Sequence, residues 1–299
     1  MSPLDQKKLV DKILPSARSI GISEDLRGWN WNRPPLKPMY DEKIPMYLVC
    51  SKYCPTSRDV FLNRVVRATA RPNEAIILGS ALHRVVSSVI NSFLDGRKIS
   101  FESWYEAILK EKQVAEAISS VRERSRIVWD YVLKNCEIQY MNRSSEQPYA
   151  TKRDLLATSV PFLVEHKISG ELLGLSGLLS VDCYDYLRGI VFDLKVAHEE
   201  KDWYRLAPTG YAIVLESVYE VPVDAGCVVY LWFQGDELRT SKDLFFINDD
   251  LRSWWLEERD NKISIVGEKR DPGISSKCYE DCIYWGVCRG EVVSNSKCE

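Results

Sequence analysis

Residues 170–195 read GELLGLSGLLSVDCYDYLRGIVFDLK, a pattern that predicts two short apolar strands joined by the polar turn YDYLRG. Asp182 ends the first predicted strand, and Asp193 and Lys195 end the second. Because successive side chains of a strand point to opposite faces, Asp193 and Lys195 share one face while Leu194 lies on the other. Two acids on adjoining strands with an amine beside them can hold a divalent cation next to a positive charge, as phosphodiester hydrolysis requires.

The composition is that of an ordinary soluble globular protein, with 299 residues of which 45% are hydrophobic and 28% charged. This length suffices for one large domain with insertions or for two modest domains. We see no apolar run that approaches a membrane span and no apolar signal-peptide core at the start, so we expect a cytoplasmic protein without a membrane partner. The net charge of −3 does not decide about nucleic acid, because carboxylates gathered around metals can offset a basic groove.

Helices and strands are predicted to alternate through the middle of the chain. Between Gly79 and Phe233 their order is helix, strand, strand, strand, helix, strand, which predicts an α/β sandwich with a central mixed sheet and helices on both sides. Around this core we expect a proline-rich extended arm within residues 1–48, helices after Pro55, from Gly79 to Gly96, over residues 101–135 and from a cap at Asp249, and a loop at residues 142–154.

The nine cysteines are unevenly distributed. Cys278, Cys282 and Cys288 lie close together near the C terminus, whereas Cys50 and Cys54 lie far upstream. In a reducing compartment such crowding indicates metal ligation rather than disulfides. Four thiolates can hold zinc or a 4Fe–4S cluster. Zinc sites favour two close pairs of ligands, so an arrangement of three cysteines plus one distant cysteine favours the cluster.

Four further motifs follow one another: the helix start from Gly79 to His83, Asp182, the strand end Asp193-Leu194-Lys195, and a helix with Tyr211. This order resembles the RecB-type branch of the PD-(D/E)XK nucleases, and the cysteines resemble its members that carry a 4Fe–4S cluster. The specific resemblance is to the Cas-four group of CRISPR-associated exonucleases. Residues 26–45, LRGWNWNRPPLKPMYDEKIP, and residues 53–65, YCPTSRDVFLNRV, are similar to its archaeal Csa-one variant. A lone histidine or a lone acid–lysine pair is usually structural, so the joint pattern carries the resemblance.

The resemblance implies a PD-(D/E)XK core, like that of restriction endonucleases, with a central mixed sheet. It divides the chain into an N-terminal arm and helix at residues 1–78, a nuclease core at residues 79–248 and a cluster-binding region at residues 249–299. The core would contain a helical insertion at about residues 97–157, where the resemblance is least clear.

The resemblance also implies the roles of individual residues. Manganese or magnesium would be held by His83, Asp182 and Asp193 with help from the Val196 carbonyl. Lys195 would face the phosphate or orient water, and Tyr211 would belong to the last motif of the site. The cluster ligands would be Cys54, Cys278, Cys282 and Cys288, with Cys50 as a rival to Cys54.

Three positions depart from the family pattern. Asp193 stands where this branch usually has glutamate, which gives the carboxylate a shorter reach. Ala207 stands where a glutamine is expected four residues before Tyr211, which puts the DNA-binding role of that helix in question. Three residues, instead of two, separate Cys278 from Cys282.

These features predict a metal-dependent DNA exonuclease with a 4Fe–4S cluster. Carboxylates and an imidazole are suitable ligands for magnesium or manganese. The resemblance implies that the enzyme processes DNA ends, with single-stranded ends as substrate, for CRISPR spacer acquisition together with integration proteins. Oligomerisation stays open. The alternative is a catalytically inactive DNA-binding scaffold subunit of a CRISPR adaptation complex, in which the fold and the cysteines are kept and the acids do not catalyse.

Overall fold

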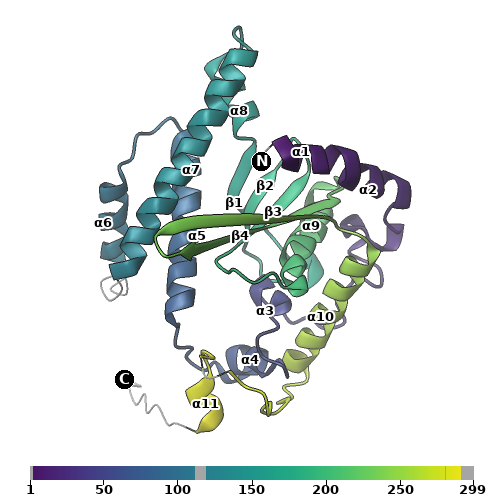
Figure 1. Cartoon of the computed structure of the whole chain (residues 1–299). Helices are drawn as coiled ribbons and strands as arrows, with labels where there is room; N and C mark the ends of the chain where they lie inside the picture. Colours follow the sequence, from purple (N-terminus) through teal and green to yellow (C-terminus); the bar gives the residue numbers. More distant parts are fainter. Residues whose placement is uncertain (1–2, 112–118, 280, 291–299) are drawn as a thin grey trace.

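A five-stranded mixed sheet forms the centre of the computed structural model, which describes residues 3–111, 119–279 and 281–290 (Figure 1). The strands lie side by side in chain order; β3 and β4 are parallel, and the other neighbours are antiparallel. The predicted α/β class with a central mixed sheet is confirmed. The strands are β1 Phe162–Ile168, β2 Leu179–Asp185, β3 Ile190–Lys195, β4 Ala225–Gln234 and β5 Glu237–Phe246.

The turn between β2 and β3 is fixed by a buried carboxylate. Asp185 accepts hydrogen bonds from the backbone N–H groups of Leu187 and Arg188, both at 3.1 Å, and its other oxygen lies 2.7 Å from the Arg188 guanidinium. An aspartate that bonds the backbone two and three residues ahead stabilises a tight turn. Gly189 completes the turn at φ +64°, a conformation that glycine adopts without strain. The polar turn expected between two apolar strands is therefore present.

Helix α9, Leu206–Tyr219, connects the parallel strands β3 and β4, because parallel neighbours need a crossover instead of a hairpin. A 3-10 turn, Asp202–Arg205, precedes α9. Pro208 lies in the first turn of α9, where its missing N–H has no helical partner to lose. Nearly all of α9 is buried, which explains its almost unbroken apolar sequence.

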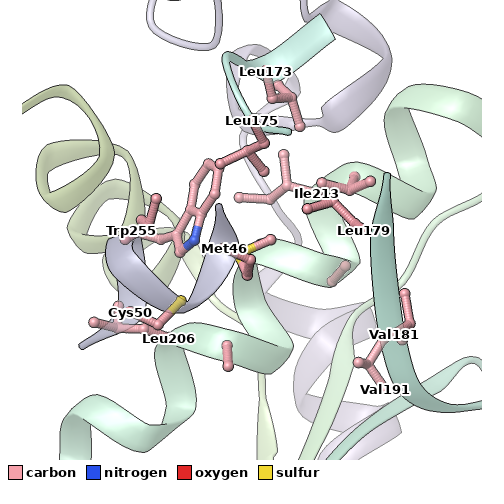
Figure 2. Packing of buried hydrophobic residues seen from close by; sticks show 14 of the residues in the cluster. Met46, Cys50, Leu173, Leu175, Leu179, Val181, Val191, Leu206, Ile213 and Trp255 are labelled. Carbon is pink, nitrogen blue, oxygen red and sulfur yellow. The ribbon is translucent and has the colours of Figure 1, made fainter. Parts of the chain in front are cut away.

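The main hydrophobic core lies between the sheet, α9 and two further helices, α3 Met46–Cys50 and α10 Asp249–Gly267 (Figure 2). Trp255 of α10 is fully buried at its centre. It fits because α9 carries Gly210, where a Cβ atom would lie 2.2 Å from the indole nitrogen of Trp255. The core therefore depends on an unusually close approach of α9 and α10.

The N-terminal residues form helices and then an arm held by the core. They begin with α1 Pro3–Lys8, a π-helical turn Leu9–Ile13 and α2 Leu14–Ile20. Two 3-10 turns follow at Glu24–Leu26 and Gly28–Asn30. The arm is anchored by the fully buried Leu36 and Ile44, and the Ile44 backbone bonds to Gly174 and Ser176.

Most other helices lie on the opposite face of the sheet or at its edges, but the helix Arg58–Phe61 packs into the main core through Val60. Side chains of α5, α6 and α7 form a second hydrophobic cluster with Leu231 of β4. A third cluster joins Leu9 to β3, β4 and β5. The remaining elements are α4 Arg58–Phe61, a π-helical turn Leu62–Val66, α5 Glu74–Leu94, α6 Phe101–Glu111, α7 Ser119–Glu146, α8 Lys152–Ser159, a 3-10 turn Glu171–Leu173 and α11 Trp285–Arg289.

Several predicted boundaries were wrong. Asp182 lies inside β2, which continues to Asp185, and the helix expected over residues 101–135 corresponds to α6 and α7. Side-chain caps explain the starts of α5, α8 and α10. α5 begins at Glu74, since the Asn73 side chain accepts a bond from Ile76 N at 2.9 Å, so Gly79 lies inside the helix. α10 is capped by Asn248 instead of Asp249. The loop predicted at residues 142–154 is shorter, because α7 continues to Glu146 and a capping box of Thr151 and Asp154 starts α8.

By length and composition α5 could cross a membrane, which corrects the expectation that no apolar run reaches that size. Inside the described part of the chain, its Leu82, Val85 and Val89 are buried in the second hydrophobic cluster. The apolar face of α5 therefore packs within the fold.

A buried carboxylate joins the arm to α9 and α10. Glu216 accepts bonds from Arg252 at 2.7 and 2.9 Å, from Arg27 at 2.8 Å and from the backbone of Gly28 and Val223. Glu216 and Arg252 are both fully buried. Removing one partner of such a pair leaves an uncompensated charge, which costs about 3–5 kcal/mol.

We predict that Glu216→Ala lowers the free energy of unfolding by about 3–5 kcal/mol, because the Arg27 and Arg252 guanidinium groups lose their buried partner. Glu257→Ala, an exposed change on α10, should alter it by no more than about 0.5 kcal/mol. Denaturant unfolding of both variants checks this. Equal stability of the two variants would show that the buried cluster does not hold the arm.

Candidate active site and cysteine cluster

Three side chains with metal-binding chemistry meet at one edge of β2. They are His83 of α5, Glu165 of β1 and Asp182 of β2, and their donor atoms all lie within 4.8 Å of one another. His83 Nδ1 is 3.4 Å from Asp182 Oδ2. Donor atoms about 2.1 Å from a magnesium ion can be at most about 4.2 Å apart. A movement of these side chains by less than about 1 Å would therefore bring all three donor atoms to bonding distance of one cation.

The pairing of β1 with β2 places Glu165 opposite Asp182. Val164 pairs with Cys183 and His166 pairs with Val181, so Glu165 and Asp182 are the intervening positions. Glu165 has φ +51°, which costs a non-glycine residue about 1–2 kcal/mol. Strained residues of this kind cluster at functional sites. Its carboxylate accepts a hydrogen bond from the Ser180 hydroxyl.

The strands β2 and β3 stop pairing where their acids begin. The last paired residues toward the site are Cys183 and Phe192, and the next facing positions are Asp182 and Asp193. Here the Asp182 side chain takes the place of a backbone hydrogen-bond acceptor: its Oδ2 accepts a hydrogen bond from Leu194 N at 3.1 Å. The two acids expected on adjoining strands, Asp182 and Asp193, therefore lie where the backbone pairing of β2 and β3 ends.

Asp193 is 4% exposed and lies beside Lys195, with Lys195 Nζ 2.9 Å from Asp193 Oδ2. The two groups are close enough for an ion pair, but the angle does not suit a hydrogen bond. Among the described residues, Asp193 Oδ2 has no hydrogen-bond donor. Burial lowers the pKa of Lys195, but Asp193 and then Asp182 outweigh it, so the pKa is raised and the amine stays charged. Asp193 lies outside the group formed by His83, Glu165 and Asp182.

Burial raises the pKa of Asp182 to about 6, with His83 opposing the rise and Asp193 adding to it. Desolvation and a like charge both disfavour the ionised carboxylate. The metal-free site therefore carries an electrostatic cost that a bound cation would remove.

Tyr211 and Val196 occupy different surroundings. Burial raises the pKa of Tyr211 well above its usual value, and the charges of Asp182 and Asp193 raise it further, so the hydroxyl remains a neutral donor beside the acids. Val196 packs against the hydrophobic cluster of α5, α6 and α7. Tyr211 thus lies near the site, while the Val196 side chain serves packing.

Sequence reasoning missed Glu165. Its segment, FLVEHKI, predicts a strand, but an acid within a strand is common on a solvated face. Only the register between β1 and β2 shows that Glu165 faces Asp182. The other two histidines have partners away from this group: His166 Nε2 lies 2.7 Å from the Tyr219 hydroxyl, and the His198 ring packs against Trp232.

The predicted cluster cysteines lie where the segment that follows Cys54 meets the C-terminal segment of Asp271 and Tyr284. Burial raises the pKa of the Cys282 thiol, and the neighbouring Cys54 and Cys288 raise it further. Arg58 donates a hydrogen bond to Cys288 Sγ at 3.4 Å, and Cys278 Sγ donates to the Ser275 carbonyl at 3.3 Å. Within residues 3–111, 119–279 and 281–290, no three of these sulfur atoms lie within 4.8 Å of one another.

Cys50, the rival to Cys54, lies in the main core beside Trp255 and Met46 (Figure 2). Burial raises the pKa of its thiol to about 12. Cys50 thus has the surroundings of an inert structural thiol.

Polar contacts join residues 56–73 to the C-terminal segment around these cysteines, where α4 and α11 lie close together (Figure 1). Arg58 forms a two-armed ion pair with Asp271, at 2.8 Å for each bond. The other contacts are Thr56 Oγ1 to the Gly273 carbonyl, Asn63 to the Tyr284 hydroxyl, Asn73 to the Asp281 carbonyl and Arg71 N to the Ile283 carbonyl.

Comparison with known proteins places the chain in a family. Residues 1–292 match the family described as CRISPR-associated exonuclease Csa1. A protein of that name from Saccharolobus solfataricus is 29% identical over 280 residues, covering 89% of this chain and 92% of the relative. Another from Thermoproteus tenax is 29% identical over 272 residues, covering 90% and 92%. The predicted resemblance is confirmed, and this chain belongs to the Csa1 family of CRISPR-associated exonucleases.

Proposed function

We propose that this protein is a metal-dependent DNA exonuclease with a PD-(D/E)XK-type core that processes DNA ends for CRISPR spacer acquisition, acting with integration proteins. The observation that carries the proposal is the convergence of His83, Glu165 and Asp182 beside the charged Lys195. The name shared by the two relatives, CRISPR-associated exonuclease, supports the same reaction class.

His83, Glu165 and Asp182 would hold manganese or magnesium, with Asp193 as the neighbouring carboxylate. A divalent cation in such a site acidifies water and offsets the negative charge of a phosphate. Lys195, oriented by Asp193, supplies a fixed positive charge for the phosphate oxygens, and fixed charges need no reorganisation during reaction. Tyr211 offers a neutral hydroxyl donor beside these acids.

We further propose that Cys54, Cys278, Cys282 and Cys288 hold a 4Fe–4S cluster that joins the Cys54 segment to the C-terminal segment. Four thiolates at about 2.3 Å from a tetrahedral zinc ion would lie about 3.8 Å apart. No three of the described sulfur atoms lie within 4.8 Å of one another, so they do not form that tetrahedral set. A cubane binds each cysteine through a different iron atom and accepts thiolates that are farther apart, and the arrangement of three cysteines plus one distant cysteine favours the cluster.

The metal ligands can be tested by Glu165→Gln and Asp182→Asn. We expect each to reduce manganese-dependent cleavage of DNA ends at least about 100-fold, because the cation supplies several kcal/mol of transition-state stabilisation. Each variant should also bind manganese more weakly in calorimetry. Glu257→Gln, an exposed change on α10, should leave both properties unaltered. Wild-type protein that binds DNA but never cuts it with manganese would favour the scaffold alternative.

The raised pKa of Asp182 predicts a pH-dependent stability in metal-free protein. Its folded pKa of about 6 exceeds the ordinary value of 3.8, so the folded state binds the extra proton and loses stability as pH rises from about 4 to about 6. Asp182→Asn removes this loss and should raise the melting temperature at pH 8 in chelator, with the difference shrinking toward pH 4. An equal difference in melting temperature at both pH values would contradict the raised pKa of Asp182.

The cluster can be tested by spectroscopy of protein purified without oxygen. We expect a broad absorption shoulder at roughly 400 nm, a general property of iron–sulfur clusters, with about four irons per chain. Cys54→Ala and Cys282→Ala should abolish it, whereas Cys50→Ala should retain it. Colourless wild-type protein that contains zinc would contradict the proposal.

A further inference from the structure

Three aromatic rings lead from the candidate site to the protein surface. Lys195 Nζ lies 5.5 Å from the centroid of the Tyr204 ring, the Tyr204 and Trp203 centroids are 4.3 Å apart, and the Trp203 and Tyr53 centroids are 4.9 Å apart. Tyr204 is 4% exposed, whereas Tyr53 is 55% exposed. The rings therefore form a row from the partly buried amine of the site to the surface.

The exposed ring is held in place by contacts on both sides. The Tyr53 hydroxyl lies 2.8 Å from the buried Tyr204 hydroxyl. The chain just before Tyr53 is fixed by Lys262, whose amine donates to the carbonyls of Val49 at 2.8 Å and Ser51 at 2.6 Å. A large exposed ring that is ordered in this way can bind a flat partner with little loss of side-chain entropy.

Two amines border the row of rings. Lys201 Nζ lies 5.5 Å from the centroid of the Tyr53 ring and 3.3 Å from Glu199 Oε2, and Lys195, which lies beside Asp193, is at the inner end of the row. An unpaired base presents a flat π-face for stacking on an aromatic ring, and its phosphate can meet an amine. Bases inside a duplex stack on one another, so only an unpaired end can use such a ring.

We propose that Tyr53 and Trp203 form a stacking surface for an unpaired base at a DNA end, which places the neighbouring phosphate beside Lys195. The proposal rests on the proposed nuclease function, for which a single-stranded end is already the expected substrate, and names the side chains that would hold that end. Tyr53 directly precedes Cys54, so the same loop would carry both a proposed cluster ligand and the proposed stacking residue.

The test measures binding without cleavage. An Asp182→Asn background in chelator is given DNA duplexes that end either blunt or in a short single-stranded overhang with a terminal 2-aminopurine. We expect Tyr53→Ala to weaken binding of the overhang at least about fivefold and to abolish quenching of the 2-aminopurine. Binding of the blunt duplex should not change.

Two further variants separate the ring from other effects. Tyr53→Phe keeps the ring and removes the hydroxyl bonded to Tyr204, so it should retain tight binding and quenching. Tyr149→Ala removes a fully exposed tyrosine outside the ring row and should also retain both. The proposal is overturned if Tyr53→Ala binds and quenches the overhang as the background protein does, the result expected of a protein-docking surface. It is also overturned if Tyr53→Ala weakens both DNAs equally.

The outcome is independent of the catalytic proposal. If wild-type protein never cleaves DNA but Tyr53-dependent quenching is observed, the stacking surface is supported and the nuclease function fails. If cleavage depends on Glu165 while Tyr53→Ala binds normally, the nuclease function is supported and the stacking surface is rejected.

Discussion

Desolvation of carboxylates that lie close together is the main constraint on the region around β2. Donor oxygens of Glu165 and Asp182 lie within 4.8 Å of one another, and the buried Asp193 lies on β3 where β2 and β3 separate. Two like charges 4 Å apart repel by about 4 kcal/mol at the effective dielectric constant of a protein surface. Burial is the main cause of the raised pKa of Asp182, the charge of Asp193 adds to it, and His83 and Lys195 compensate part of both effects. A divalent cation would complete this compensation, which is why we regard the acids as a binding site.

The surrounding structure is rigid enough to maintain this unfavourable arrangement. The Trp255 core fixes α9 and its Tyr211 against the sheet, and the buried Glu216 cluster ties the arm to the same helices. On the other face, the aromatic side chains of α6 and α7 pack against α5 and so position His83. Stabilising contacts elsewhere thus balance the strain of Glu165 and the repulsion of the acids.

Local sequence patterns predicted much of this molecule. Alternation and turn chemistry were sufficient for the β2–β3 hairpin and for its acids Asp182 and Asp193, because both depend on short-range geometry. Glu165 could not be predicted, since its role depends on the pairing register between two strands. The start of α5 was misplaced because Gly79 and Ser80 were interpreted as a helix start, whereas the Asn73 cap lies one and a half turns earlier. The contacts between the segment that follows Cys54 and the C-terminal segment also depend on tertiary packing, which spacing alone does not reveal.

The most direct test of the central claim is an anomalous-difference map from a crystal soaked in manganese. We predict one strong peak at roughly 2.0–2.4 Å from a donor atom of each of His83, Glu165 and Asp182, with Lys195 nearby but not coordinating. No peak between these three side chains, or manganese bound only elsewhere on the protein, would contradict the account.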